Sequence, residues 1–291
     1  MTDFTVITDE QIDPESPVTS ELMTGLRDNA IAIAEQATGA PYIETPYDIQ
    51  IFPTSGTWTK PADALSGEKV RVFLFGGGGG GCARNLDARI GDSFGGGGGG
   101  GLAYLFYEMD DLAATASVTV GAGGVGGTRS GSAGSSAGSD GGDSVFSSAG
   151  TLVLKAVGGE GGGSSASSGD GGGVSLTKGG RSQTIPAHLG GSGSSSNDSQ
   201  TSVGPYSYFG GGAGGISDAS AAPQNIGPTV SELAGDGGAE DVGSGDRTGG
   251  DGSFPSGGGG AASSSTSAAT SNGGDGADGY CFVLCYRKVD L

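Results

Sequence analysis

The sequence FGGGGGGCARNLDARIGDSFGGGGGGGLAYLF, from Phe75 to Phe106, places two runs of pure glycine on either side of a short polar loop. The runs cover residues 76–81 and 95–101, and apolar residues stand at their outer ends. In the whole chain 66 of 291 residues are glycine, far above the usual share of about 7%. Because glycine loses more conformational freedom on folding than any other residue, ordering these runs requires strong compensating contacts.

The segments that flank the glycine runs are apolar and rich in β-formers. VRVFLF (70–75) leads into the first run and LAYLFY (102–107) follows the second. SVTV (117–120), LVLKAV (152–157) and CFVLCY (281–286) adjoin later glycine-rich stretches in the same way. These segments predict strands, and flexible Gly/Ser linkers lack such anchors. We therefore expect the glycine runs to be ordered.

Glycine runs have one regular conformation that suits this pattern, the extended threefold polyglycine II helix. It rises about 3.1 Å per residue without internal hydrogen bonds, so six residues span about 19 Å. Its peptide groups point outward, and several such helices satisfy one another only where no Cβ intervenes. Since ordering costs about 1–2 kcal/mol per residue, many runs must pack together. The expected scaffold glycines are Gly76, Gly78, Gly80, Gly95, Gly98 and Gly101.

The first 50 residues have a different composition, with little glycine and many acidic residues. SELMTGLRDNAIAIAEQATGAP predicts a helix capped by Thr19 or Ser20, with Glu21 in its first turn and Gly39 at its end. Its apolar residues form one narrow seam made of Met23, Leu26, Ala30 and Ile33. Two interpretations stay open: the helix packs on its own chain, or it is an oligomerisation or docking helix.

Together these patterns predict a mostly β and irregular fold. A small N-terminal helical segment precedes short β-strands, which continue into packed polyglycine II helices with loops at the distal end. We expect two regions, an attachment or oligomerisation segment at residues 1–50 and a glycine-rich domain at residues 51–291.

Charge and cysteine content exclude several functional classes. The net charge of −19 disfavours binding to nucleic acid or to anionic membranes. The acidic N-terminus does not have the pattern of a secretory signal, and no apolar stretch reaches the length of a membrane span. In a strand, Cys281 and Cys285 share one face about 13 Å apart, too far for a disulfide between them. We expect both to be reduced and half-buried.

The sequence offers little for catalysis or cofactor binding. Glycine runs match GxGxxG many times, but no helix follows them, as dinucleotide binding requires. His188 is the single histidine, and no metal-ligand spacing is present. Asp-Gly pairs, such as those at Asp140 and Asp251, are interpreted as turns. We expect no enzyme activity, no cofactor and no metal.

The motifs GTWTKPAD, VRVFLFGGGGGG, VTVGAGGVGG and GADGYCFVLCY resemble the glycine-rich domain of tailed-phage fibre and adhesin proteins. The N-terminal segment ITDEQIDPESPVTSELMTGLRDNAIAIAEQATGAP also resembles the leader of phage tail-associated proteins. The resemblance implies a virion tail component, made in the host cytoplasm, whose distal loops contact a bacterial outer-surface receptor. That receptor would be an outer-membrane protein or a surface polysaccharide. Other tail proteins are the implied partners, with the chain as a homotrimer or as a cap on a trimeric fibre.

Two loops carry the candidate receptor-binding residues. The loop between the first two glycine runs concentrates charge, and its arginines suit acidic sugars or phosphates. A later loop ends in tyrosines, which stack on sugars and anchor protein contacts. The candidates are Arg84, Asn85, Asp87, Arg89, Tyr206 and Tyr208. Ion pairing within the first loop, and packing of the aromatic rings against the next glycine slab, remain alternatives.

Two other functions are compatible with these features. One is a virion structural protein without adhesive activity, such as a head fibre or a fibre-assembly factor. The other is a glycine-rich ice-binding protein with a flat face of small residues.

Overall fold

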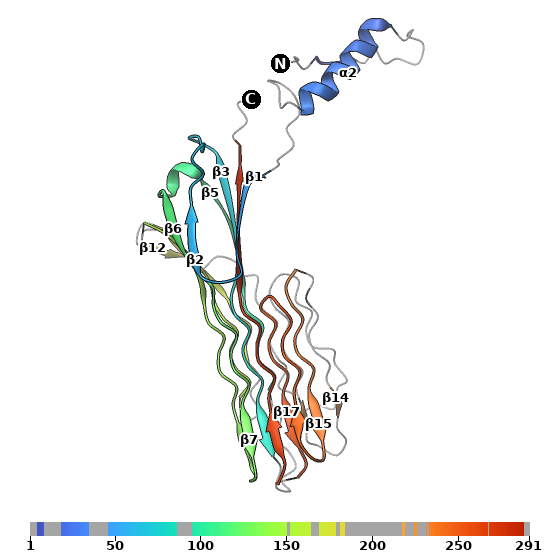
Figure 1. The fold of residues 1–291 in the computed structure, drawn as a ribbon, viewed down its shortest axis with the longest axis vertical. Coiled ribbons are helices and arrows are strands. Elements are labelled where there is room, and N and C mark those ends of the chain that lie inside the picture. The colour runs from blue at the N-terminus through green and yellow to red at the C-terminus, as the bar shows by residue number, and fades with distance from the viewer. Residues whose placement is uncertain are drawn as a thin grey trace.

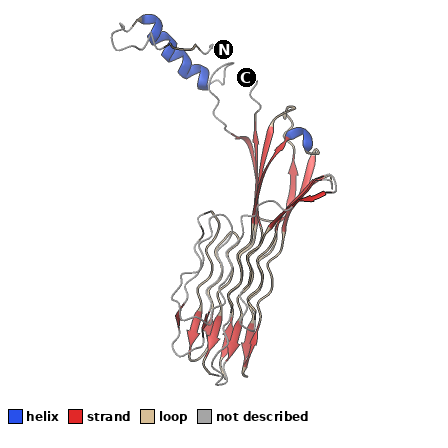
Figure 2. Ribbon diagram, turned by 180° about the vertical axis from the view of Figure 1, so that it is seen from behind, coloured by secondary structure: helices blue, strands red, loops and turns tan. Residues whose placement is uncertain are grey.

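The computed structural model describes residues 5–8, 19–34, 46–85, 95–149, 152–163, 169–178, 181–183, 217–218, 224–225, 231, 233–266 and 268–287. The described parts form an elongated molecule with a β-sandwich, a bundle of extended glycine segments and a set of short strands at the far end (Figures 1 and 2). No described helix is long and apolar enough to cross a membrane.

Helix α2 spans Ser20–Ala34, and its start follows the sequence prediction. The Thr19 hydroxyl accepts a hydrogen bond from the Leu22 amide at 3.1 Å, which caps the first turn. The extended residues 5–8 lie beside the helix, held by two 2.8 Å hydrogen bonds between the backbone of Thr5 and the Asn29 side chain. The predicted helix end at Gly39 lies outside the described residues.

Two antiparallel sheets form the sandwich. The first, which we call sheet A, has the order β1-β19-β3-β5, with strands Pro46–Phe52, Tyr280–Tyr286, Lys69–Phe75 and Leu102–Glu108. The second, sheet B, has the order β12-β11-β10-β9-β6-β2. Its strands are Arg181–Gln183, Val174–Lys178, Leu152–Ala156, Ser144–Ser148, Thr115–Thr119 and Gly56–Thr59. The 3-10 turn η1, Met109–Asp111, joins β5 to β6.

The core lies between the two sheets. Alternate residues of β3 and β19, such as Val72 and Val283, are fully buried against sheet B. Trp58 from β2 meets the edge of Phe146 from β9, with ring centroids 6.0 Å apart. Cys281 and Cys285 lie on this inner face as free thiols, which confirms their shared face, although they are fully buried and not half-buried.

Strand β1 belongs to the β-sandwich. It starts at Pro46 and pairs along its length with β19, joining Ile49 to Leu284 and Ile51 to Phe282. The boundary expected from composition, between residues 50 and 51, therefore falls inside a strand of the sandwich.

The strands run directly into the glycine bundle below the sandwich (Figure 1). Its described segments are 76–82, 95–101, 121–127, 138–143, 157–163, 169–173, 235–240, 249–253, 257–261 and 273–279. Asp140 and Asp251 lie within these segments, so the interpretation of their Asp-Gly pairs as turns is wrong.

The central segment 76–81 shows how the bundle is held together. Every amide in it donates to a backbone carbonyl at 2.8–2.9 Å. The segment that supplies the acceptor changes from one residue to the next, and the same segment returns at every third residue. Gly76 and Gly79 donate to segment 95–101, Gly77 and Gly80 to 138–143, and Gly78 and Gly81 to 273–279. Carbonyls of the same segment accept amides from 121–127, 157–163 and 257–261, and the Gly76 carbonyl accepts the Ser256 hydroxyl at 2.6 Å. This threefold repeat with neighbours on all sides is the polyglycine II packing that the sequence predicted.

At the end of the bundle away from the sandwich, the chain again forms short strands. One sheet has the order β15-β17-β4-β8 and the other β16-β18-β7. Their strands are Asp241–Gly243, Ala262–Ser264, Ala83–Asn85 and Gly134–Ser136 in the first, and Arg247–Thr248, Thr270–Asn272 and Thr128–Ser130 in the second. A separate two-stranded pair joins β13, Ser217–Asp218, to β14, Gln224–Asn225.

Candidate functional site at the distal tip

The short strands carry a surface at the end of the molecule opposite the N-terminus and the C-terminal strand (Figures 1 and 2). We call it the distal tip and define it by the described residues of three turns, 130–134, 243–247, and 264–266 with 268–270. The exposed residues of these turns are small or polar, including Ser132, Ser244 and Thr266.

An arginine holds the first turn. The Arg129 guanidinium donates from Nη2 to the Ser132 hydroxyl at 2.9 Å and to the Ala133 carbonyl at 2.8 Å. Gly131, with φ of +68°, supplies the left-handed residue of this turn. The Arg129 side chain thus donates these hydrogen bonds within the turn, and they fix its backbone conformation.

The second turn repeats this arrangement. Arg247 Nη1 donates to Asp241 Oδ1 at 3.2 Å, and Nη2 donates to the Ser244 carbonyl at 2.5 Å. The other Asp241 oxygen accepts the Thr248 amide at 3.0 Å, and Gly245 has φ of +87°. The chain again closes a Ser/Gly turn around one half-buried arginine.

The third turn is tied to the second. The Ser265 amide donates to the Gly243 carbonyl at 2.7 Å, and Asp246 accepts the Thr270 amide at 2.7 Å. Ser264 and Thr266 exchange a hydroxyl contact at 3.0 Å. These bonds join the two turns into one surface whose shape does not depend on large apolar side chains.

A buried polar pair lies beneath the turns. Asn85 and Ser271 are both fully buried, and the Ser271 hydroxyl donates to Asn85 Oδ1 at 2.7 Å. Asn85 Nδ2 in turn donates to the Ala269 carbonyl at the base of the third turn. Because buried amide groups need partners, this pair fixes the register between β4 and the third turn.

The structure corrects part of the predicted receptor site. Arg84 and Asn85 belong to strand β4, between β17 and β8, and their exposed fractions are 7% and 0%. The prediction that they are exposed loop contacts is therefore wrong, because the chain continues from the bundle into the buried strand β4 and does not open into a loop there. Asp87, Arg89, Tyr206 and Tyr208 lie outside the described residues.

The predicted scaffold glycines lie within the bundle. A Cβ built on Gly76, Gly78, Gly80, Gly98 or Gly101 would lie 2.0–2.5 Å from a carbonyl oxygen of a neighbouring segment. Gly95 is buried, and its carbonyl accepts the Cys82 amide at 3.1 Å. The predicted helix seam is on the surface of the described chain, with Met23, Leu26 and Ala30 exposed and Ile33 half-buried.

Sequence reasoning missed the two arginine-held turns. Their signal is a single arginine within a Ser/Gly stretch, in TRSGSAG at Arg129 and in GSGDRTGG at Arg247. Strands β17 and β18 each lie between two other strands of their sheets at the tip.

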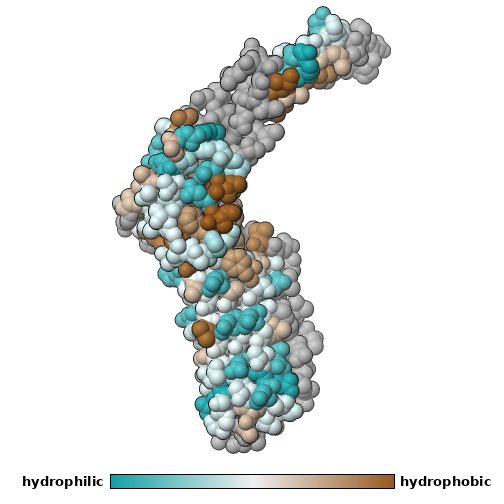
Figure 3. Space-filling view, in the orientation of Figure 1, coloured by the Kyte–Doolittle hydropathy of each residue, from teal (hydrophilic) through white to brown (hydrophobic). Residues whose placement is uncertain are grey.

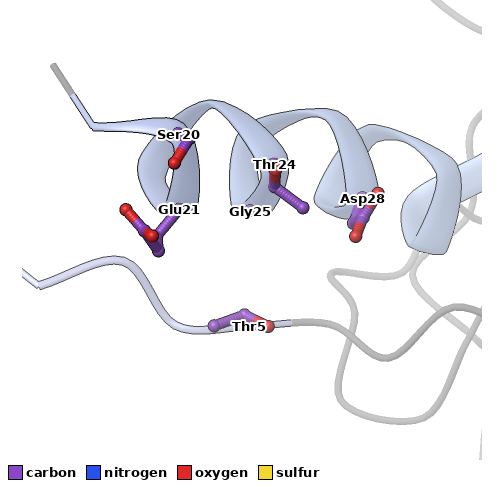
Figure 4. Close-up of a pocket in the computed structure, with 6 residues that line it drawn as sticks. All are labelled: Thr5, Ser20, Glu21, Thr24, Gly25 and Asp28. Atoms are coloured by element: carbon purple, nitrogen blue, oxygen red, sulfur yellow. The ribbon is translucent and has the colours of Figure 1, made fainter.

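A recess lies at the other end of the described chain, between residues 5–8 and α2 (Figure 4). It is open and has a volume of about 340 Å³, and Thr5, Ser20, Glu21, Thr24, Gly25 and Asp28 line it. Within the described residues no group of histidine, cysteine and carboxylate side chains is arranged to hold a metal ion.

The comparisons with known proteins agree with the architecture. The family model described as "Glycine-rich domain" matches residues 53–286, from the end of β1 to the last residue of β19. The comparison with curated proteins gives no match. Since the family model covers most of the chain, the protein belongs to the glycine-rich domain family.

Proposed function

We propose that this chain is a tail-fibre or fibre-tip adhesin of a tailed phage, and that it binds a bacterial surface receptor through the distal tip. The observation that carries the proposal is the tip itself: three hydrogen-bonded turns of small polar residues at the end of a side-chain-poor rod. The rod holds this surface away from the N-terminal segment, which the resemblance assigns to attachment on the particle.

The chemistry of the tip indicates the kind of contact. Exposed hydroxyls and backbone groups, with Asp246 as an exposed carboxylate, suit hydrogen bonding to polysaccharide or to the loops of a surface protein. Single contacts of this kind are weak, but several copies on one particle raise the avidity by orders of magnitude. Because the turns are held internally, little conformational entropy is lost on binding.

The test is binding of the labelled full-length chain to susceptible cells, with competition against adsorption of the phage that carries it. Ala133→Tyr and Ser265→Tyr add bulk to exposed tip positions without removing a hydrogen bond of the turns. Each should reduce cell binding at least tenfold while the melting temperature stays unchanged. The matched control is Val125→Tyr, a change of similar size on the exposed flank of the bundle, which should bind like wild type.

The outcomes separate the candidate functions. Loss of binding after protease treatment of the cells identifies a protein receptor, and loss after polysaccharide removal identifies a glycan. If the chain binds no susceptible cell, or if both tip variants bind like the control, the adhesin proposal fails. A chain that is present on the particle without binding cells would favour the virion structural role.

A further inference from the structure

The glycine bundle has edges, where an outer segment has no neighbouring segment on one side. In a threefold helix successive amides point in three directions, and the same direction returns at every third residue. In the central segment 76–81 all three directions meet carbonyls of other segments. An outer segment must find other acceptors for the amides that point outward, because an uncovered row of backbone groups is a template for pairing with another chain, as at the edge of a β-sheet.

Segment 121–127 lies at such an edge. Its Gly124 and Gly127 amides donate to carbonyls of the central segment, both at 2.8 Å. In the second direction the Val125 amide donates to the Ser139 hydroxyl at 2.7 Å. A side chain therefore supplies an acceptor where the central segment uses the backbone of a neighbour.

Two aspartates cover the third direction. The Gly123 amide donates to Asp278 Oδ1 and the Gly126 amide donates to Asp275 Oδ1, both at 2.7 Å. Both aspartates belong to the adjoining segment 273–279 and are exposed. Their carboxylates thus occupy the position that carbonyls of a further glycine segment would take if the bundle continued outward.

Segment 157–163 repeats this arrangement at another edge of the bundle. Two of its amide directions meet carbonyls of neighbouring segments. In the third, the Gly158 and Gly161 amides donate to Asp143 and Asp140, at 3.1 and 2.8 Å. Two separate segments are therefore closed in the same way, by aspartates three residues apart.

The edge at 121–127 retains uncovered acceptors. Gly123 and Gly126 are half-buried, and within the described ranges their carbonyls accept no hydrogen bond. Without the two aspartate side chains the segment would present donors and acceptors together. The same segment of a second copy carries the matching groups, and its Gly123 and Gly126 have no side chain to hold the two backbones apart.

We propose that Asp275 and Asp278 close this edge and so prevent the glycine bundles of two copies from joining through segment 121–127. The carboxylates satisfy the outward amides, and the side chains fill the space that an incoming segment would need. Figure 3 shows hydrophilic side chains distributed over the otherwise pale surface of the bundle. The proposal concerns the flank of the bundle, so it does not depend on what the distal tip binds.

Replacing both aspartates with glycine tests the proposal on the full-length chain. Asp275→Gly/Asp278→Gly removes both acceptors and clears the space beside Gly123 and Gly126. Its mass in solution, measured by sedimentation over a range of concentrations, should rise with concentration to at least twice the mass of the wild-type particle. A mass equal to that of wild type at every concentration would overturn the proposal.

Two control variants separate closure of the edge from charge and from loss of stability. Asp275→Asn/Asp278→Asn removes both charges but keeps an oxygen acceptor at each position, and it should keep the wild-type mass. Ser144→Ala removes the acceptor of the Gly121 amide, 2.9 Å away, at a fully buried position that a second copy cannot reach. This variant should lose stability without a change in mass. Association of either control to the extent of the glycine variant would show that the aspartates do not act as proposed.

Amide exchange locates the contact. In the glycine variant the Gly123 and Gly126 amides should exchange fast at low concentration and become protected as the mass rises. The Gly124 and Gly127 amides, which donate to the central segment, should stay protected throughout. A rise in mass that leaves Gly123 and Gly126 unprotected would place the association elsewhere and overturn the proposal.

Discussion

At the scale of single residues, the fold depends on the absence of Cβ atoms at defined positions. A Cβ on Gly78 would lie 2.0 Å from the Gly257 carbonyl oxygen, and one on Gly98 would lie 2.1 Å from that of Asp170. The neighbouring atoms belong to the backbone of packed segments, which cannot move aside to make space for a Cβ. The glycine runs allowed this packing to be predicted from sequence. The sequence does not tell which glycines are indispensable, because that depends on whether a residue faces a neighbouring segment.

Gly172 and Gly173 illustrate this and provide a prediction. They are adjacent in one run, but a Cβ on Gly172 would lie 2.0 Å from the Val157 oxygen, whereas one on Gly173 meets nothing within 4 Å. Gly172→Ala should lower the free energy of unfolding by about 3 kcal/mol or more. Gly173→Ala should be neutral or stabilising by up to about 1 kcal/mol, because it restricts the unfolded chain. Urea titration measures both, and equal effects of the two variants would refute close backbone packing in this run.

At the scale of elements, aspartates complete the hydrogen bonding of the outer segments. Asp278 and Asp275 accept the amides of Gly123 and Gly126, both at 2.7 Å. Asp143 and Asp140 do the same for Gly158 and Gly161, at 3.1 and 2.8 Å. The three-residue spacing of each pair matches the threefold helix. Carboxylates thus act as acceptors for amides on the outer side of these segments.

The aspartate pairs give a prediction at this scale. Asp275→Ala should lower the free energy of unfolding by about 1 kcal/mol, because the Gly126 amide loses its acceptor. Asp275→Asn should lower the free energy of unfolding by a smaller amount, since its amide oxygen still accepts a hydrogen bond. Glu160→Ala, which removes an exposed carboxylate from a bundle segment, serves as the control and should be neutral. If Ala and Asn at position 275 are equivalent, the carboxylate does not have this role.

The elements also show where sequence reasoning succeeds and where it fails. Strands β3, β5, β10 and β19 were predicted because their apolar runs are compact and adjoin glycines. Strand β1 was missed, because its isoleucines point to solvent while Asp48 and Gln50 are partly buried, which inverts the usual pattern. The three-residue aspartate spacing is present in the sequence, but Asp-Gly pairs are typical of turns, so the spacing alone does not predict hydrogen bonds to glycine segments. The arginine-held turns depend on single side chains and carry almost no periodic signal.

At the scale of the whole molecule, a buried carboxylate ties the C-terminal strand to the start of the sandwich. Glu68 is fully buried and accepts hydrogen bonds from the Tyr47 hydroxyl at 2.7 Å, the Leu65 amide at 3.1 Å and Arg287 at 3.0 Å. Arg287 also pairs with Asp63 and lies over the Tyr47 ring. This cluster joins residues from three distant parts of the chain at the end opposite the tip.

The cluster predicts how stability changes with pH. Burial pushes the pKa of Glu68 upward, but the hydrogen bonds from Tyr47, Leu65 and Arg287 outweigh it and hold the pKa below the ordinary value of 4.5. A carboxyl whose pKa is lowered by folding stabilises the protein above its unfolded-state pKa, and this contribution disappears as the pH falls through the folded-state pKa. The unfolding free energy should therefore decline as the pH drops below about 4.5.

Glu68→Gln isolates this contribution. The variant should be less stable than wild type at pH 7, and the difference between the two should shrink as the pH falls below 4.5, because the unfolded wild-type chain then binds a proton that the folded chain does not. Denaturant titrations at pH 3 to 7 measure that difference. A constant difference across the range would show that the charge of Glu68 does not contribute to folding.

Amide hydrogen exchange at residues 76–81 tests whether bare glycine segments form a rigid scaffold. Each of these amides donates to a carbonyl of a neighbouring segment at 2.8–2.9 Å. All six amides should exchange only through global unfolding, with protection equal to that of the buried strand β3. Exchange at the rate of a free glycine peptide, while β3 stays protected, would contradict this expectation.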